Sequence, residues 1–123
     1  MATQMIAAAA LCVLAAAGTA RAMPLKPSAT DIFKNYALST CLADGYHADE
    51  VVKDDAASAR AFLELGSFPL EAHTQATALG REFLKRDYPS ISGQPLVLMK
   101  CLDFYRSGEL AALVRRYGKR TPK

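Results

Sequence analysis

The chain has 123 residues, a formal net charge of +3 and 51% hydrophobic residues. This length suits one domain of ordinary size. This net charge is too small to imply nucleic-acid binding, which is usually accompanied by a concentrated basic patch.

The first 22 residues have the pattern of a cleavable signal peptide. An uncharged apolar run from Ile6 to Ala17 is too short to span a bilayer as a helix, which takes about 20 residues, but it suits the apolar region of a secretory signal. Ala20-Arg21-Ala22 then supplies the small residues that a signal peptidase accepts. We therefore predict cleavage after Ala22 and export of residues 23–123 as one domain without a membrane segment.

Cleavage at this point leaves two of the three cysteines, Cys41 and Cys101, because Cys12 leaves with the signal. The loss of Arg21 lowers the net charge by one, to +2. In an oxidising compartment, two cysteines most simply form one disulfide. This bridge would close a loop of about 60 residues and contribute roughly 4 kcal/mol in the chain-entropy model. The alternative is a catalytic thiol beside a second free thiol.

Helical periodicity runs along most of the mature chain. The spacing predicts a first helix that Thr30 caps and that ends near Tyr46, with Asp31 at its positive end. A second helix is expected from about Ala48 to Ser67. The predicted inward positions are Phe33, Tyr36, Ala37, Thr40 and Cys41 in the first helix and Val52, Ala56, Ala59 and Leu63 in the second.

The second half of the chain continues the helical pattern. Pro69 suits the first turn of a third helix, because its missing N–H would be unpaired there anyway, and this helix is expected to end near Tyr88. After a breaker-rich segment, a fourth helix is predicted from about Leu96 to Arg106, and Ser107 can cap a short fifth one. The predicted inward positions are Ala72, Ala76, Leu79 and Phe83, then Leu98, Cys101, Leu102 and Tyr105, then Leu110, Leu113, Val114 and Tyr117.

These elements predict an all-α fold, a compact bundle of four to five helices with one disulfide, after a cleaved signal peptide. Cys41 and Cys101 both fall on inward stripes, of the first and fourth predicted helices. This placement favours a bridge between packed helices over a solvent-facing nucleophile.

Residues that could perform chemistry are scarce. We interpret the two histidines, His47 and His73, as solvated surface residues, and the sequence contains no HExxH or CxxC motif. The acidic residues of the second predicted helix lack the glycine-centred loop of a calcium site. We therefore predict no catalytic residue, no cofactor and no metal.

Two blocks of the sequence resemble a known family. The segment Asp31–Tyr46, DIFKNYALSTCLADGY, is similar to the first-helix motif of the immunity proteins that neutralise type VI secretion amidase effectors. The segment Leu98–Ser107, LMKCLDFYRS, with the apolar positions that follow it, resembles their second block. The Arg86-Asp-Tyr segment between the two blocks resembles the end of the family's third helix. The resemblance spans essentially the whole mature chain.

This resemblance implies a periplasmic, non-enzymatic inhibitor that works as a homodimer. Its partner would be a peptidoglycan amidase effector with a papain-like Cys-His site. In the family, a loop between the third and fourth helices reaches into the catalytic groove of the amidase. Here the corresponding partner-binding residues are Tyr88, Pro89, Ser90, Ile91, Ser92, Gly93, Gln94 and Pro95. This loop is shorter than in the family and contains no acidic residue.

Three alternatives stay open at this point. The loop can be an ordinary helix connector. The protein can be a small periplasmic ligand carrier with a cavity lined by Phe33, Phe62, Phe83 and Phe104. It can also be a periplasmic hydrolase or redox enzyme, if the two cysteines are free thiols.

Overall fold

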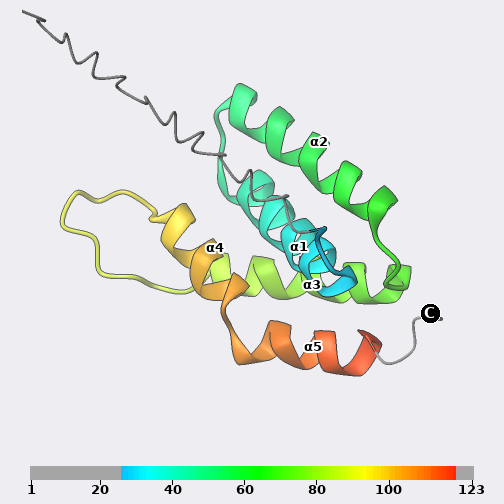
Figure 1. The fold of residues 1–123 in the computed structure, drawn as a ribbon. Coiled ribbons are helices and arrows are strands. Elements are labelled where there is room, and N and C mark those ends of the chain that lie inside the picture. The colour runs from blue at the N-terminus through cyan, green and yellow to red at the C-terminus, as the bar shows by residue number, and fades with distance from the viewer. Residues whose placement is uncertain (1–25, 119–123) are drawn as a thin grey trace, which may run out of the picture.

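The structure, a computed structural model, describes residues 26–118. Within this range it contains five helices and no strand, so the all-α prediction is confirmed (Figure 1). The helices are α1 (Ala29–Gly45), α2 (Asp49–Leu65), α3 (Leu70–Leu84), α4 (Val97–Tyr105) and α5 (Gly108–Gly118). The predicted signal peptide, residues 1–22, lies outside the described residues.

Helix α1 is the centre of the bundle and packs against each of the other four helices. Helix α3 also packs against α4 and α5, whereas α2 packs mainly against α1. Figure 1 shows the result, with α2 and α5 on opposite sides of α1 and α3. The side chains buried in the core come from every helix except α2, with Phe68 from the connection after α2.

The first helix begins two residues earlier than predicted. Ser28, and not Thr30, is its N-cap: the Ser28 hydroxyl accepts the Asp31 N–H at 3.1 Å, and the Asp31 carboxylate accepts the Ser28 N–H at 2.9 Å. This reciprocal capping box satisfies two backbone donors at once, which a lone Thr30 hydroxyl would not do. The hydrogen bonds from Ser28 lower the pKa of Asp31.

The predicted disulfide is confirmed. Cys41 of α1 and Cys101 of α4 are bonded, with their Cα atoms 5.8 Å apart, and both are buried. Helix α3 can approach this bridge closely because Gly80 has no side chain. A Cβ atom at Gly80 would stand 3.1 Å from Cε1 of Phe104 and 3.5 Å from Cβ of Cys41.

The prediction of the inward face of α2 was wrong in part. Ala56 and Leu63 are exposed, and Ala59 is the one buried residue of the helix. Because α2 packs mainly against α1, only a narrow strip of it is covered. The half-buried residues of this strip are Val52, Asp55, Ser58 and Phe62.

Candidate partner-binding site

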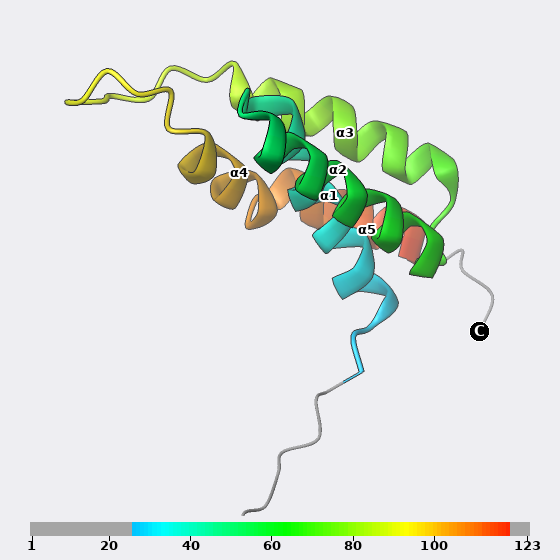
Figure 2. The ribbon, with the colours of Figure 1, turned by 90° about the horizontal axis from the view of Figure 1, so that it is seen from above.

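The predicted partner-binding residues all lie in the connection between α3 and α4. Helix α3 ends at Leu84 and not near Tyr88, so this connection runs from Lys85 to Leu96. At this end of α3 the Lys100 ammonium donates to the Leu84 carbonyl at 3.2 Å, and so satisfies one of the carbonyls that have no partner within the helix. The connection projects from one end of the bundle in both views (Figures 1 and 2).

The tip of this loop is built from long hydrogen bonds between neighbouring residues. The Gly93 N–H donates to the Ser90 carbonyl at 3.3 Å, and Gly93 has a φ of +74°, a conformation that glycine adopts without strain. The Ser92 hydroxyl lies 3.4 Å from the Ser90 hydroxyl and accepts the Gln94 N–H at 3.4 Å. This turn leaves Ile91 fully exposed, more than any other large apolar side chain among residues 26–118.

The two ends of the loop are fixed to the body of the protein. At the first end, the Tyr88 hydroxyl donates to the Asp103 carboxylate of α4 at 2.5 Å, and this hydrogen bond raises the pKa of Tyr88. At the second end, Leu96 adopts the left-handed conformation, with φ +51°, and the chain turns there into α4.

Beside the second end lies an apolar surface that the sequence did not reveal. Leu98, predicted to point inward, is 51% exposed, and Met99 is 52% exposed. The run from Leu96 to Met99 is apolar on all sides of the helix, so periodicity alone does not identify the inward residue. Cys101 is buried as predicted, but its buried neighbours on the helix are Val97 and Phe104. Of the other predicted inward residues, Leu102 and Tyr105 are half-buried and Leu98 is exposed.

These exposed residues border an open pocket of about 420 Å³ between the end of α1 and the start of α4. Its lining residues are Gly45, Tyr46, His47, Gln94, Pro95, Leu96, Val97, Leu98 and Met99. The last two predicted loop residues are therefore continuous with an apolar surface on the body of the bundle. A run of four apolar residues next to a proline was the available signal for it.

The two histidines differ in their environment. His47 is exposed at the rim of the pocket, as predicted. The prediction for His73 was wrong, because this side chain is only 1% exposed. Its ring meets the edges of Phe33 and Tyr36 of α1, and its Nδ1 lies 3.0 Å from the Pro69 carbonyl. Its Nε2 has no hydrogen-bond partner within the described residues.

Burial lowers the pKa of His73, and the backbone hydrogen bond to Pro69 only partly opposes this effect. The unfolded chain therefore binds a proton more readily than the folded protein near and below the ordinary histidine pKa of about 6.5. We expect the stabilising contribution of the buried, neutral His73 side chain to be complete above this pKa. It is lost as the pH falls toward the lowered pKa of the folded state.

Urea unfolding at several pH values between about 7.5 and 5 checks this prediction. The His73→Phe variant is expected to lose less stability on acidification than the wild type does. His47→Gln is the matched control, and it is expected to behave like the wild type because His47 is exposed. Equal pH dependence of His73→Phe and the wild type would contradict the assignment to His73.

Residues 26–118 do not bring together a reactive centre. No group of three or more His, Cys, Asp or Glu in this range is placed to hold a metal ion. The disulfide removes both thiols that a cysteine-dependent enzyme would need. Phe33, Phe83 and Phe104 are packed into the core and fill the space that a ligand carrier would require. Also within this range, no helix has the length and apolar character to cross a membrane.

The fold and the loop together define a class of protein, a small disulfide-bonded helical bundle that presents an exposed apolar residue on a projecting loop. The family model Tai4, described as type VI secretion system (T6SS) amidase immunity protein, matches residues 31–114. The chain belongs to this family.

Solved structures agree with this assignment. A chain of the effector–immunity system Tae4/Tai4 from Salmonella typhimurium is 33% identical, with a TM-score of 0.69 over 73% of this chain and 89% of that chain. The type VI effector–immunity complex Tae4–Tai4 from Enterobacter cloacae shares the fold at 24% identity, with a TM-score of 0.65 over 72% and 90%. No curated protein sequence matches the chain.

Family membership decides between an immunity protein, a ligand carrier and an enzyme. The chain is an immunity protein for a type VI secretion amidase effector and is not an enzyme. The resemblance seen in the sequence is thereby confirmed.

Proposed function

We propose that this protein protects the periplasm by binding a peptidoglycan amidase effector and occluding its active site with the loop Tyr88–Pro95. The observation that carries the proposal is the position of Ile91, a fully exposed apolar side chain at the tip of a loop that projects from the bundle. Exposure of such an apolar side chain to water contributes no stability, whereas its burial in a partner's pocket would contribute to binding.

The chemistry of the loop suits an active-site groove. The loop residues from Tyr88 to Pro95 carry no charge, so their insertion buries no unpaired ion. Ser90, Ser92 and Gln94 offer hydrogen-bond donors and acceptors beside Ile91. Pro89 and Pro95 restrict the backbone and so reduce the conformational entropy lost on binding.

The exposed apolar surface beside the loop supports a second contact with the same partner. Leu98 and Met99 lie three and four residues after Pro95 and line the pocket with it. A partner that receives the loop tip would cover these side chains as well, which would add apolar burial at the edge of the interface.

Three further parts of the proposal concern the exported protein and its partner. Residues 1–22 act as a signal peptide that is cleaved after Ala22, and the mature protein resides in the periplasm, where peptidoglycan amidases act. The mature protein works as a homodimer. The amidase partner has a papain-like Cys-His site, whose groove the loop blocks to substrate.

Substitution of the loop tip tests the proposal. Ile91→Asp is expected to weaken inhibition of the amidase at least about 30-fold, because a central apolar anchor contributes about 2 kcal/mol and the carboxylate would be buried without a partner. Inhibition is measured as loss of muropeptide cleavage, with amidase effectors encoded beside this gene or delivered by neighbouring bacteria.

Leu70→Asp is the matched control. Like Ile91, Leu70 is an exposed aliphatic side chain, with 72% of its surface accessible, but it lies at the opposite end of α3 from the loop. It is expected to leave inhibition unchanged. If Ile91→Asp inhibits the amidase as strongly as the wild type and Leu70→Asp do, occlusion by this loop is wrong.

A further inference from the structure

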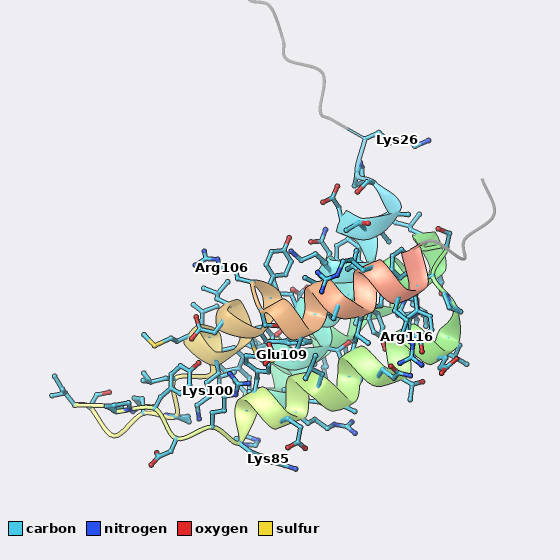
Figure 3. The ribbon with its side chains drawn as sticks, turned by 90° about the horizontal axis from the view of Figure 1, so that it is seen from below. Lys26, Lys85, Lys100, Arg106, Glu109 and Arg116 are labelled. Carbon is cyan, nitrogen blue, oxygen red and sulfur yellow. A yellow bond between two sulfur atoms is a disulfide. The ribbon has the colours of Figure 1, made fainter. Side chains whose placement is uncertain are left out.

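Three side chains connect the first end of the loop to two helices. The Tyr88 hydroxyl donates to the Asp103 carboxylate, and the Lys100 ammonium lies 5.7 Å from the centre of the Tyr88 ring. The same ammonium donates to the Leu84 carbonyl at the end of α3. Figure 3 shows Lys100 between α4 and the end of α3, near Lys85.

Lys100 and Asp103 can act on one tyrosine because they are three residues apart on α4 and therefore share a face of the helix. The cation faces the Tyr88 ring and the carboxylate accepts its hydroxyl proton. A hydrogen bond to a charged acceptor is stronger than one between neutral groups. The packing of α4 in the core, through Cys101 and Phe104, gives these two side chains a rigid base.

We propose that Tyr88, Lys100 and Asp103 form a stem clamp that holds the loop in its binding conformation before the amidase arrives. The three are positioning residues for Ile91. The inference rests on the proposed function of the loop. It adds an explanation of how the free protein holds the loop in the conformation that binds the amidase.

The physical need for such a clamp follows from the length of the connection. Twelve residues from Lys85 to Leu96 contain no helix, and free segments of this kind lose conformational entropy when a partner orders them. Pro95 and the left-handed Leu96 restrict the second end of the loop, but they do not hold the first end. Arg86 is held by its guanidinium over the Phe83 ring and by an ion pair with Glu109 of α5. Without Tyr88 bound to α4, the loop would therefore pivot just after Arg86 and present Ile91 in many directions.

Order parameters of the free mature protein test the clamp without any amidase. In the wild type, the backbone S² values of residues 90–94 are expected to lie near those of the helices, about 0.85, and to fall toward about 0.6 in Tyr88→Phe. Tyr105→Phe is the matched control on α4. Its ring faces Lys34 in the wild type and phenylalanine keeps this contact. A wild-type loop that is already flexible, or one that Tyr88→Phe leaves rigid, would overturn the inference.

Binding to the amidase that the wild type inhibits provides the second readout. Tyr88→Phe and Asp103→Leu are each expected to reduce affinity about fivefold to tenfold, because only a fraction of the free protein then holds the competent loop. The double variant is expected to lose no more than either single one. Asp103→Asn, which keeps an acceptor oxygen, is expected to retain most of the affinity.

The outcomes separate the clamp from the proposed function. If Ile91→Asp weakens inhibition but Tyr88→Phe changes neither order nor affinity, the clamp is wrong and occlusion stands. If Tyr88→Phe loosens the loop while Ile91→Asp still inhibits fully, the clamp orders the loop, but occlusion by the loop is wrong and so is the role of the clamp in inhibition.

Discussion

The double variant Cys41→Ala, Cys101→Ala is expected to lose about 3 to 4 kcal/mol of unfolding free energy relative to the oxidised mature protein. The two residues are 60 apart in sequence, so the bridge removes a large share of the chain entropy of the unfolded state. Both side chains are buried, and alanine avoids burying the hydroxyl groups that serine would introduce. For a small domain this is a large part of the total stability.

Urea unfolding of the oxidised protein, the reduced protein and the double variant measures this loss. The reduced wild type is the natural control, because it lacks the covalent bond and keeps both sulfur atoms. It is expected to unfold at a urea concentration near that of the double variant. Equal midpoints for the oxidised and reduced wild type would show that the bridge contributes nothing.

The second large effect is expected at Phe104. Its side chain is fully inaccessible, packs against Phe83 with the ring centres 5.4 Å apart, and lies over the open face of Gly80. Phe104→Ala leaves a cavity between α4 and α3 and is expected to lower the unfolding free energy by about 3 to 5 kcal/mol. Without the Phe104 ring, Gly80 of α3 has no side chain of α4 to pack against at this point.

Leu98→Ala is the matched control for this variant, since both residues belong to α4 and Leu98 is half exposed. It is expected to change the unfolding free energy by less than about 1 kcal/mol. Thermal or urea unfolding of the two variants with an intact disulfide measures the contrast. A larger loss for Leu98→Ala than for Phe104→Ala would indicate the register predicted from the sequence and contradict the one described above.

The order of the helices and the disulfide could be predicted because each depends on local spacing. Cys41 and Cys101 each fell on an inward stripe, and two cysteines in an exported chain leave one possible pair. The errors arose where a tertiary contact outweighs local pattern. His73 is polar and near a helix start, yet it is buried because the first turns of α3 press against Phe33 and Tyr36.

The candidate site was predictable only in part. Its position came from the resemblance to the family, and Pro89 and Pro95 marked it as a loop. The sequence does not show that Tyr88 reaches Asp103, because these residues belong to different elements and meet only after α4 has packed. Nor does it distinguish Leu98 from Val97 as the exposed residue, since both are apolar and adjacent.

The peripheral position of α2 has a consequence for the cooperativity of folding. The disulfide and the packed rings join α1, α3 and α4, and α5 adds Leu110 and Tyr117 to the same core. Helix α2 contributes one buried alanine and stands mainly on α1. The molecule therefore divides into a covalently closed unit and an outer helix whose opening leaves most of the core intact.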